Sequence, residues 1–97
     1  MITYVCLLSF TDQGIRTAKD TMKRAAAFKE MAKKFGVTTK EIFWTQGQYD
    51  LVSIIEAPDE LSATAANLSL CALGNVRTQS LRAFSADEMK QIIAKMA

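Results

Sequence analysis

Residues Ile2 to Phe10 alternate between two sets of side chains, and both sets are largely apolar. Alternation predicts a strand, and two apolar faces predict a strand that is covered on both sides. We therefore expect these residues to form a central strand of a sheet.

A helix is predicted to follow the polar break Thr11-Asp12-Gln13-Gly14 and to end at Phe35, because Gly36 supplies a helix stop. Its apolar stripe comprises Ala18, Met22, Ala25, Phe28, Ala32 and Phe35. A second interpretation stays open. Asp20 or Thr21 can cap a shorter main helix, which leaves residues 11–19 as a separate turn.

Two strands joined by a turn are predicted next. In residues 40–46, Ile42 and Trp44 are expected on one side of a strand and Phe43 on the other, and residues 51–57 are rich in Val and Ile. The segment Gly47-Gln48-Tyr49-Asp50 between them is a turn signal, so the two strands are expected to form a hairpin.

A second helix begins at Pro58-Asp59-Glu60, since acidic residues suit a first turn, and runs to about Leu73 before Gly74. It carries two apolar stripes, one with Leu61, Ala65, Leu68 and Ala72 and the other with Ala63, Ala66, Leu70 and Leu73. One sheet covers only one stripe, so we infer that a partner chain or another helix covers the second.

A fourth strand, Asn75 to Phe84, precedes a short C-terminal helix. Ser85-Ala86-Asp87-Glu88 matches the capping box, and the apolar residues that follow at helical spacing are Met89, Ile92, Ile93 and Met96. The resulting order, βαββαβ with a trailing helix, is the ferredoxin-like pattern. It predicts an α+β fold in which residues 1–97 form a single domain, with an antiparallel four-stranded sheet in the strand order 4-1-3-2.

Both main helices are predicted to cover one face of this sheet. The opposite face would expose apolar residues such as Phe43, Val52 and Leu81. The usual solution in this architecture is a second copy packed sheet against sheet. We therefore expect a homodimer or higher homo-oligomer of the dimeric α+β-barrel type.

Three polar, glycine-bearing segments are predicted to converge at one end of the sheet. The strand directions bring residues 11–14, 47–50 and 74–78 together there. The first helix begins at the same end and offers unpaired N–H groups. This end of the sheet is the candidate binding site.

The composition narrows the chemistry that the chain can perform. The 97 residues are 49% hydrophobic and 23% charged, which is typical of a globular domain. Histidine is absent, which excludes His-ligated haem or zinc and catalytic Ser-His-Asp or Cys-His sets. Cys6 and Cys71 lie among apolar residues, so we expect free, unreactive thiols, no metal site and no cofactor. Neither a membrane span nor a secretory signal is visible, which favours a cytoplasmic protein.

The net charge of +2 hides a basic stretch. Residues 16–34 hold seven basic and two acidic side chains, so the rest of the chain is net acidic. A solvated helix face explains this pattern better than a nucleic-acid surface does, so no nucleic-acid partner is expected.

Three segments in the same order resemble the GYD-domain family: residues 10–16, residues 47–52 with 56–59 behind them, and residues 72–78 continuing to 81–84. The resemblance spans residues 3–84. It implies a small bacterial or archaeal protein of the dimeric α+β-barrel type without an established activity. The hairpin and the segment Gly74-Asn75-Val76-Arg77-Thr78 are also similar to the ligand-sensing domain of leucine-responsive transcriptional regulators, where such segments bind amino acids at subunit interfaces. The helix-turn-helix of those regulators is missing here.

We expect a ligand-binding set at the convergent end of the sheet, formed by Asp12, Gln13, Tyr49, Asp50, Asn75 and Arg77. The turn residues Gly14, Gly47 and Gly74 are expected to be structural. Structural alternatives stay open, since Asp50 can cap its own turn, Tyr49 can anchor the hairpin and Arg77 can form a surface ion pair. No catalytic residue and no metal ligand is assigned.

Three functions are compatible with these residues. The first is a homo-oligomer in which Asp50 and Arg77 supply opposite charges to a small zwitterionic or anionic ligand. The second is a cofactor-independent monooxygenase or isomerase with an apolar cavity lined by Tyr49, Trp44 and Arg82, on a scaffold similar to the monooxygenases of antibiotic biosynthesis. No complete catalytic set of that group is matched. The third is a structural or interaction protein whose basic helix docks an acidic partner.

Overall fold

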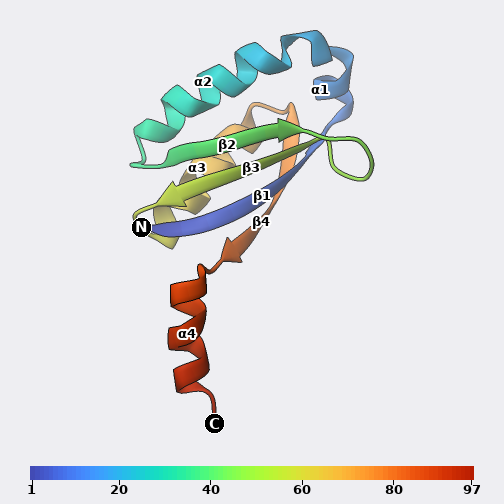
Figure 1. Cartoon of the computed structure of the whole chain (residues 1–97). Helices are drawn as coiled ribbons and strands as arrows, with labels where there is room; N and C mark the ends of the chain where they lie inside the picture. Colours follow the sequence, from blue (N-terminus) through green and yellow to red (C-terminus); the bar gives the residue numbers. More distant parts are fainter.

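The computed structural model describes residues 1–97 and contains one antiparallel sheet with two helices packed on one face (Figure 1). The elements in chain order are β1 (Ile2–Phe10), α1 (Asp12–Arg16), the 3-10 turn η1 (Ala18–Asp20), α2 (Thr21–Lys33), β2 (Thr38–Trp44), β3 (Leu51–Ala57), α3 (Glu60–Ala72), β4 (Val76–Ala83) and α4 (Ala86–Lys95). The sheet order is β2-β3-β1-β4, and all neighbouring strands are antiparallel. The predicted ferredoxin-like α+β fold with strand order 4-1-3-2 is therefore confirmed.

β1 lies between β3 and β4, and its residues alternate between two environments. Cys6 and Leu8 face the helices and are buried. Val5 and Leu7 lie on the other face, where Leu7 pairs with Val52 of β3. The predicted central strand is confirmed, and the register shows which set of side chains faces the helices.

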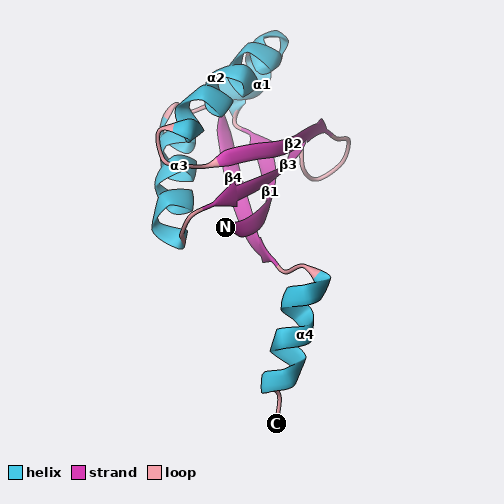
Figure 2. Ribbon diagram, turned by 60° about the vertical axis from the view of Figure 1, so that its left-hand side comes forward, coloured by secondary structure: helices cyan, strands magenta, loops and turns pink.

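The core fills the space between the sheet and the helices α2 and α3 (Figure 2). Ile55 of β3 and Val37, just before β2, have the largest fully buried side chains. On the helix side, Ala32, Ala63 and Ala66 are buried, and their small side chains let both helices lie close to the strands.

The segment between β1 and β2 breaks after α1. The continuous helix predicted up to Phe35 is therefore wrong, and the alternative, a shorter main helix that begins near Asp20, is confirmed. The guanidinium of Arg24 donates to the carbonyl oxygens of Thr17 at 3.1 Å and Gly14 at 3.2 Å. These bonds satisfy acceptors that a continuous helix would have paired internally.

This break also changes the predicted apolar stripe of the first helix. Phe28 and Ala32 are buried against the sheet, with Ala25 and Phe35 half-buried beside them. Met22 is 71% exposed, so its assignment to the stripe is wrong. The new helix start places Met22 in the first turn of α2, outside the contact with the sheet.

β2 begins and ends two residues before the predicted strand at 40–46. An irregularity between Thr39 and Glu41 interrupts the alternation, which hides the true start of the strand. Thr45 already belongs to the turn, because its N–H donates to the carbonyl of Asp50 at 2.9 Å. β3 has its predicted bounds, and β4 is one residue shorter at each end than predicted.

α3 buries one of its two apolar stripes, except at Leu73, which caps the helix end and is 62% exposed. Ala63, Ala66 and Leu70 pack toward the sheet, whereas Leu61 and Leu68 are 84% and 66% exposed. No other part of the chain covers the second stripe.

The sheet face opposite the helices is uncovered as well (Figure 2). The register aligns Phe43, Val52 and Leu7 across three strands of this face, and Leu81 lies beside Val5. Phe43 is 54% and Leu81 43% exposed. We call these five residues the open sheet face.

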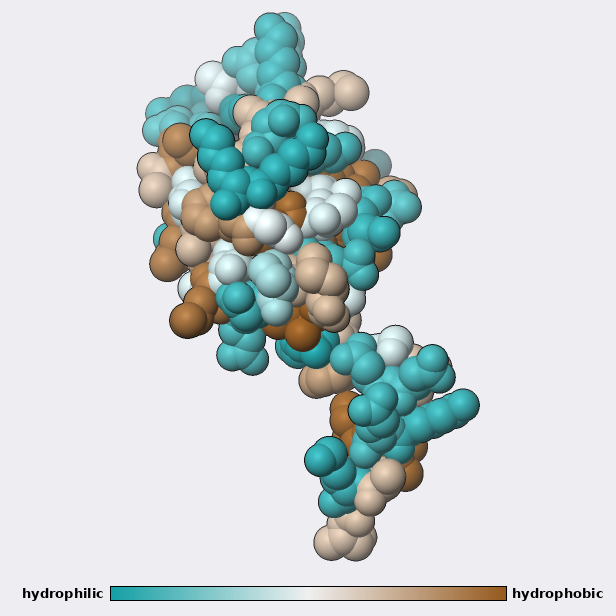
Figure 3. All heavy atoms as spheres, turned by 90° about the vertical axis from the view of Figure 1, so that its left-hand side faces the viewer, coloured by the Kyte–Doolittle hydropathy of each residue, from teal (hydrophilic) through white to brown (hydrophobic).

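α4 extends away from the rest of the chain and is joined to it by a narrow neck (Figure 3). Its predicted capping box is present, since the Ser85 hydroxyl accepts from the Glu88 N–H at 3.1 Å and the Glu88 carboxylate accepts from the Ser85 N–H at 3.0 Å. Glu88 also pairs with Arg82 of β4 at 3.3 Å. Apart from half-buried Ile92, the large apolar residues of α4 are exposed, namely Met89 and Ile93, and so is Met96 directly after the helix.

Candidate functional site

Two of the three predicted segments meet directly at one end of the sheet, beside α1 in Figure 1. The Thr11 N–H donates to the Asn75 carbonyl at 3.1 Å, and the Thr11 hydroxyl donates to the Gly74 carbonyl at 2.5 Å. The side-chain amide of Gln13 donates to the Leu73 carbonyl at 3.1 Å and to Asn75 Oδ1 at 3.0 Å. The start of α1 and the end of α3 therefore form one hydrogen-bonded unit.

Glycine permits the close approach of these two segments. A Cβ added at Gly14 would lie 1.9 Å from the carbonyl oxygen of Asn75, so a larger residue does not fit. Gly74 adopts a φ of 88°, a left-handed conformation that favours glycine at the end of a helix. The backbone contact at Gly14 and the backbone conformation at Gly74 therefore both favour glycine.

The hairpin turn, residues 45–50, is tied to the same end by two side chains. Asp50 Oδ2 accepts from the Phe10 N–H at 2.8 Å, and the Asp50 N–H donates to the Leu8 carbonyl at 2.8 Å. The Tyr49 hydroxyl donates to Gln79 Oε1 at 2.7 Å. The third predicted segment is therefore joined to the end of β1 and to the middle of β4.

Asp12 and Arg77 complete the predicted set, and both are exposed. Arg77 lies opposite Ser9 of β1, near the end where the turns meet. Neither charge forms an ion pair in the structure. The other four predicted residues, Gln13, Tyr49, Asp50 and Asn75, use their side chains in internal hydrogen bonds, so ligand binding at this end stays a prediction.

Within one chain, the three residues expected to line an apolar cavity, Tyr49, Trp44 and Arg82, do not come together, and a cavity between two copies stays a prediction. The Trp44 indole N–H donates to the Thr21 hydroxyl at 3.0 Å, and Arg82 pairs with Glu88 at the root of α4. They separate because β2 is an edge strand next to α2, whereas β4 is the opposite edge.

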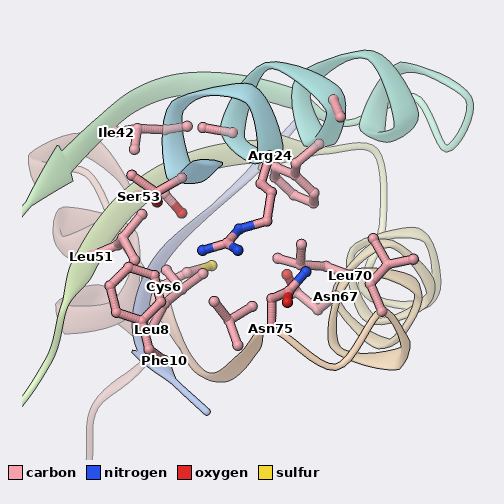
Figure 4. Close-up of a pocket in the computed structure, with 16 residues that line it drawn as sticks. Cys6, Leu8, Phe10, Arg24, Ile42, Leu51, Ser53, Asn67, Leu70 and Asn75 are labelled. Carbon is pink, nitrogen blue, oxygen red and sulfur yellow. The ribbon is translucent and has the colours of Figure 1, made fainter. Parts of the chain in front are cut away.

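A cavity of about 110 Å³ does exist, between α2, α3 and the helix-facing side of the sheet (Figure 4). Most of the side chains in its wall are apolar, among them Leu8, Leu51, Leu70 and Val76. We call this space the helix–sheet cavity. None of the ligand-binding residues predicted from the sequence except Asn75 contributes to it.

Arg24 is the one charged side chain in the wall of the helix–sheet cavity. It is half-buried, and Figure 4 shows its guanidinium reaching from α2 toward Asn75 and the strands. The guanidinium carbon lies 5.8 Å from the centre of the Phe10 ring, within the range of a cation–π contact.

Arg24 is absent from the site residues predicted from the sequence, because the whole basic stretch is interpreted there as a solvated helix face. That interpretation fits Lys23 and Lys29, which are exposed. Arg24, however, lies four residues before Phe28 and eight before Ala32, so helical periodicity already places it on the buried face of α2.

A second hollow of about 270 Å³ runs between α3 and the edge strand β4. Asn67, Leu68, Cys71 and Thr78 are among the residues that line it. The thiol of Cys71 lies 3.7 Å from the Thr78 hydroxyl, and both cysteines of the chain are free. No cluster of three or more acidic or cysteine side chains could hold a metal ion, and no helix is long and apolar enough to cross a membrane.

Two carboxyl groups have lowered pKa values, and both cap helices. The Ser62 N–H, which donates to Asp59 at 2.7 Å, lowers the pKa of Asp59. The Ser85 N–H lowers the pKa of Glu88, with a smaller contribution from Arg82. The physical cause is hydrogen bonding to the charged form, so both groups are structural caps of α3 and α4.

The fold and its two uncovered apolar surfaces define a small ferredoxin-like α+β protein. The GYD domain model matches residues 4–93, and the chain belongs to the GYD domain family. It is similar to the glutamine synthetase and cystathionine beta-lyase binding protein of Thermus thermophilus, with 32% identity over 84 residues that cover 86% of this chain and 88% of the relative. No solved structure gives a significant match.

Proposed function

We propose that this protein is a homo-oligomeric interaction protein that binds a metabolic enzyme. The observation that carries the proposal is the exposed stripe of α3, in which Leu61 and Leu68 are 84% and 66% exposed. Contiguous exposed apolar side chains on a small protein mark an interaction surface. The relative from Thermus thermophilus is named for binding two enzymes, which supports a partner of this class.

The open sheet face is assigned to a second copy of the chain. Its apolar residues come from all four strands and form a surface that a second sheet can cover. In a twofold dimer the same surface is used by both protomers, so Phe43 and Leu81 of each copy would be buried together. This contact leaves α2 and α3 on the outside of the dimer.

The enzyme is assigned to the outer helical layer. Leu68 of the exposed stripe also lines the hollow between α3 and β4, whose wall contains the exposed basic residue Arg77. An enzyme surface with an apolar patch bordered by acidic side chains fits this layer. Its charged contacts at the rim would make association weaker at high salt.

The direct test uses purified glutamine synthetase and cystathionine beta-lyase from the same organism as the chain. Binding of each enzyme to the immobilised protein is measured by interferometry, with Leu68→Glu as the disrupting variant. We expect the wild type to bind at least one enzyme, and Leu68→Glu to lose at least about tenfold in affinity because a charge replaces an apolar contact.

The matched control is Met22→Glu, which introduces the same charge at an exposed apolar residue outside the stripe. We expect it to bind like the wild type. Absence of binding to both enzymes, or equal losses in the two variants, contradicts the proposal.

A second candidate function is the binding of a small zwitterionic ligand at the end of the sheet where residues 11–14, 47–50 and 74–78 converge. It is favoured by Asp12 and Arg77, which carry opposite charges at this end and have no ion-pair partner. A thermal-shift screen with amino acids tests it. Stabilisation that is lost in Arg77→Gln supports this function, and the absence of any stabilising amino acid contradicts it.

A further inference from the structure

We propose that the helix–sheet cavity is a binding site for a short aliphatic carboxylate of four or five carbons, whose carboxylate group pairs with Arg24. This site lies on the opposite face of the sheet from the open sheet face. It is also distinct from the exposed stripe of α3 and does not depend on the proposed function above.

The first argument is the charge of Arg24. The guanidinium is half-buried, and no acidic residue lines the cavity or forms an ion pair with it. A positive charge at the mouth of an apolar space is favourable when an anion neutralises it. The cavity therefore selects an anionic ligand.

The second argument is the number of free donors on Arg24. Three of its hydrogen bonds go to the Thr17 carbonyl, the Thr17 hydroxyl and the Gly14 carbonyl. A guanidinium has five N–H donors, so two remain for a ligand. The same bonds hold the group in place, which means that a carboxylate meets a pre-ordered partner.

The third argument is Ser53 of β3. This residue is only 6% exposed, lies in the wall of the cavity and makes none of the side-chain hydrogen bonds of the structure. Its hydroxyl, which no protein group occupies, can form a hydrogen bond with a polar group of a ligand. The cavity therefore offers a cation at its mouth and a few polar side chains, Thr21, Ser53, Asn67 and Asn75, in a wall that is otherwise apolar.

The size of the space sets the class of ligand. An engineered apolar cavity of about 150 Å³ accommodates benzene, so the 110 Å³ available here suits a smaller group such as a branched four-carbon chain. With the carboxylate at the half-exposed Arg24, the chain would lie among Leu8, Leu51 and Leu70. The probe that matches this description is 3-methylbutanoate.

The test is an NMR titration of the wild-type protein with 3-methylbutanoate and with 3-methylbutanamide, its neutral analogue of the same shape. We expect saturable shifts in the amides of residues 6–8 and 51–53 with the carboxylate, and at least about tenfold weaker binding of the amide. Inorganic phosphate serves as a third probe. It lacks the apolar chain and is expected to bind more weakly than the carboxylate.

Two variants locate the carboxylate. We expect Arg24→Gln to lose at least about tenfold in affinity for 3-methylbutanoate but to bind the amide as the wild type does. Lys23→Gln is the matched control, because it removes the same charge from the next residue, which is exposed and does not line the cavity. It is expected to bind both probes like the wild type.

Equal binding of carboxylate and amide by the wild type overturns the proposal, as does phosphate binding as tight as that of the carboxylate. Shifts confined to residues outside the cavity wall, or no saturable shifts, overturn it too. These comparisons use the wild-type protein, so they decide the question even if Arg24→Gln fails to fold. None of them involves an enzyme partner, so a negative result leaves the interaction proposal to its own test.

Discussion

The carboxylate of Asp50 extends the pairing between β1 and β3 beyond the last residue of the ladder. It accepts from the Phe10 N–H, while its own backbone N–H donates to Leu8. An aspartate in a turn signature thus has a structural role that does not need a ligand. Substitution of Asp50 can separate this structural role from a role in ligand binding.

We expect Asp50→Ala to lower the free energy of unfolding by about 1 to 3 kcal/mol, because the half-buried Phe10 N–H loses its acceptor. Asp50→Asn keeps an oxygen at the same place and is expected to lose less. Urea denaturation of the three proteins measures the difference. If Asp50→Ala is as stable as the wild type, the hydrogen bond from Phe10 to Asp50 does not stabilise the fold, and a role in ligand binding becomes the better explanation.

The contact between Gly14 and Asn75 makes a second prediction at this scale. Gly14→Ala is expected to destabilise the fold by about 3 kcal/mol or more, because the new Cβ overlaps a backbone oxygen that cannot move freely. Gly47→Ala is the comparison. Its φ of 106° is strained for alanine but nothing lies within 4 Å, so a loss of about 1 to 2 kcal/mol is expected. Thermal unfolding that ranks Gly47→Ala as the more harmful change contradicts this account.

At the scale of elements, periodicity and end signals predicted β1 and β3 with their bounds and placed α3 and the capping box of α4. These local signals gave wrong element bounds where a tertiary contact determines the local structure. The break before α2 depends on Arg24 reaching back to Thr17, and the start of β2 is hidden by the irregularity near Thr39. The same limit applies to the candidate site. Strand direction predicted the convergence of the turns, but the helix–sheet cavity depends on packing between α2 and α3 that no local pattern encodes.

α4 provides a prediction on pH. Hydrogen bonding in the folded helix lowers the pKa of Glu88 below its ordinary value of 4.5. The stabilisation is therefore fully present above that value and is lost as the pH falls through the lowered pKa. We expect the Cα chemical shifts of residues 86–95 to move toward random-coil values over this acidic range.

Glu88→Gln is the matched variant for the pH prediction. Its amide oxygen keeps the acceptor of the capping box but does not titrate, so the pH dependence of α4 should shrink. A pH profile unchanged by Glu88→Gln contradicts the assignment.

At the scale of the whole molecule, helices cover one side of the sheet and leave the other bare. Of the 97 residues, 49% are hydrophobic, which is more than the helix-covered face of the sheet can bury. Large side chains such as Phe43 and Leu81 therefore remain exposed on the bare face. The proposed second copy would remove the asymmetry, because each sheet would then have two covered faces.

We expect the wild type to sediment as the proposed oligomer, and Phe43→Glu to sediment as a monomer at micromolar concentration. Twofold symmetry places the new charge in the interface twice, where like charges repel and lose water. Leu61→Glu, a similar change on the outer helical layer, is expected to leave the oligomer intact. A wild-type protein that sediments as a monomer contradicts the assignment of the open sheet face.

The separation of α4 from the rest of the chain couples its folding to its surroundings. α4 has 10 residues, and helices shorter than about 12 to 15 residues are marginal in water by themselves. The capping box supports only the first turn, so the remaining turns need an apolar surface against Met89, Ile93 and Met96. If another protomer supplies that surface, helix content becomes concentration-dependent. The circular-dichroism signal per residue should then fall on dilution, while the sheet persists until the fold itself is lost.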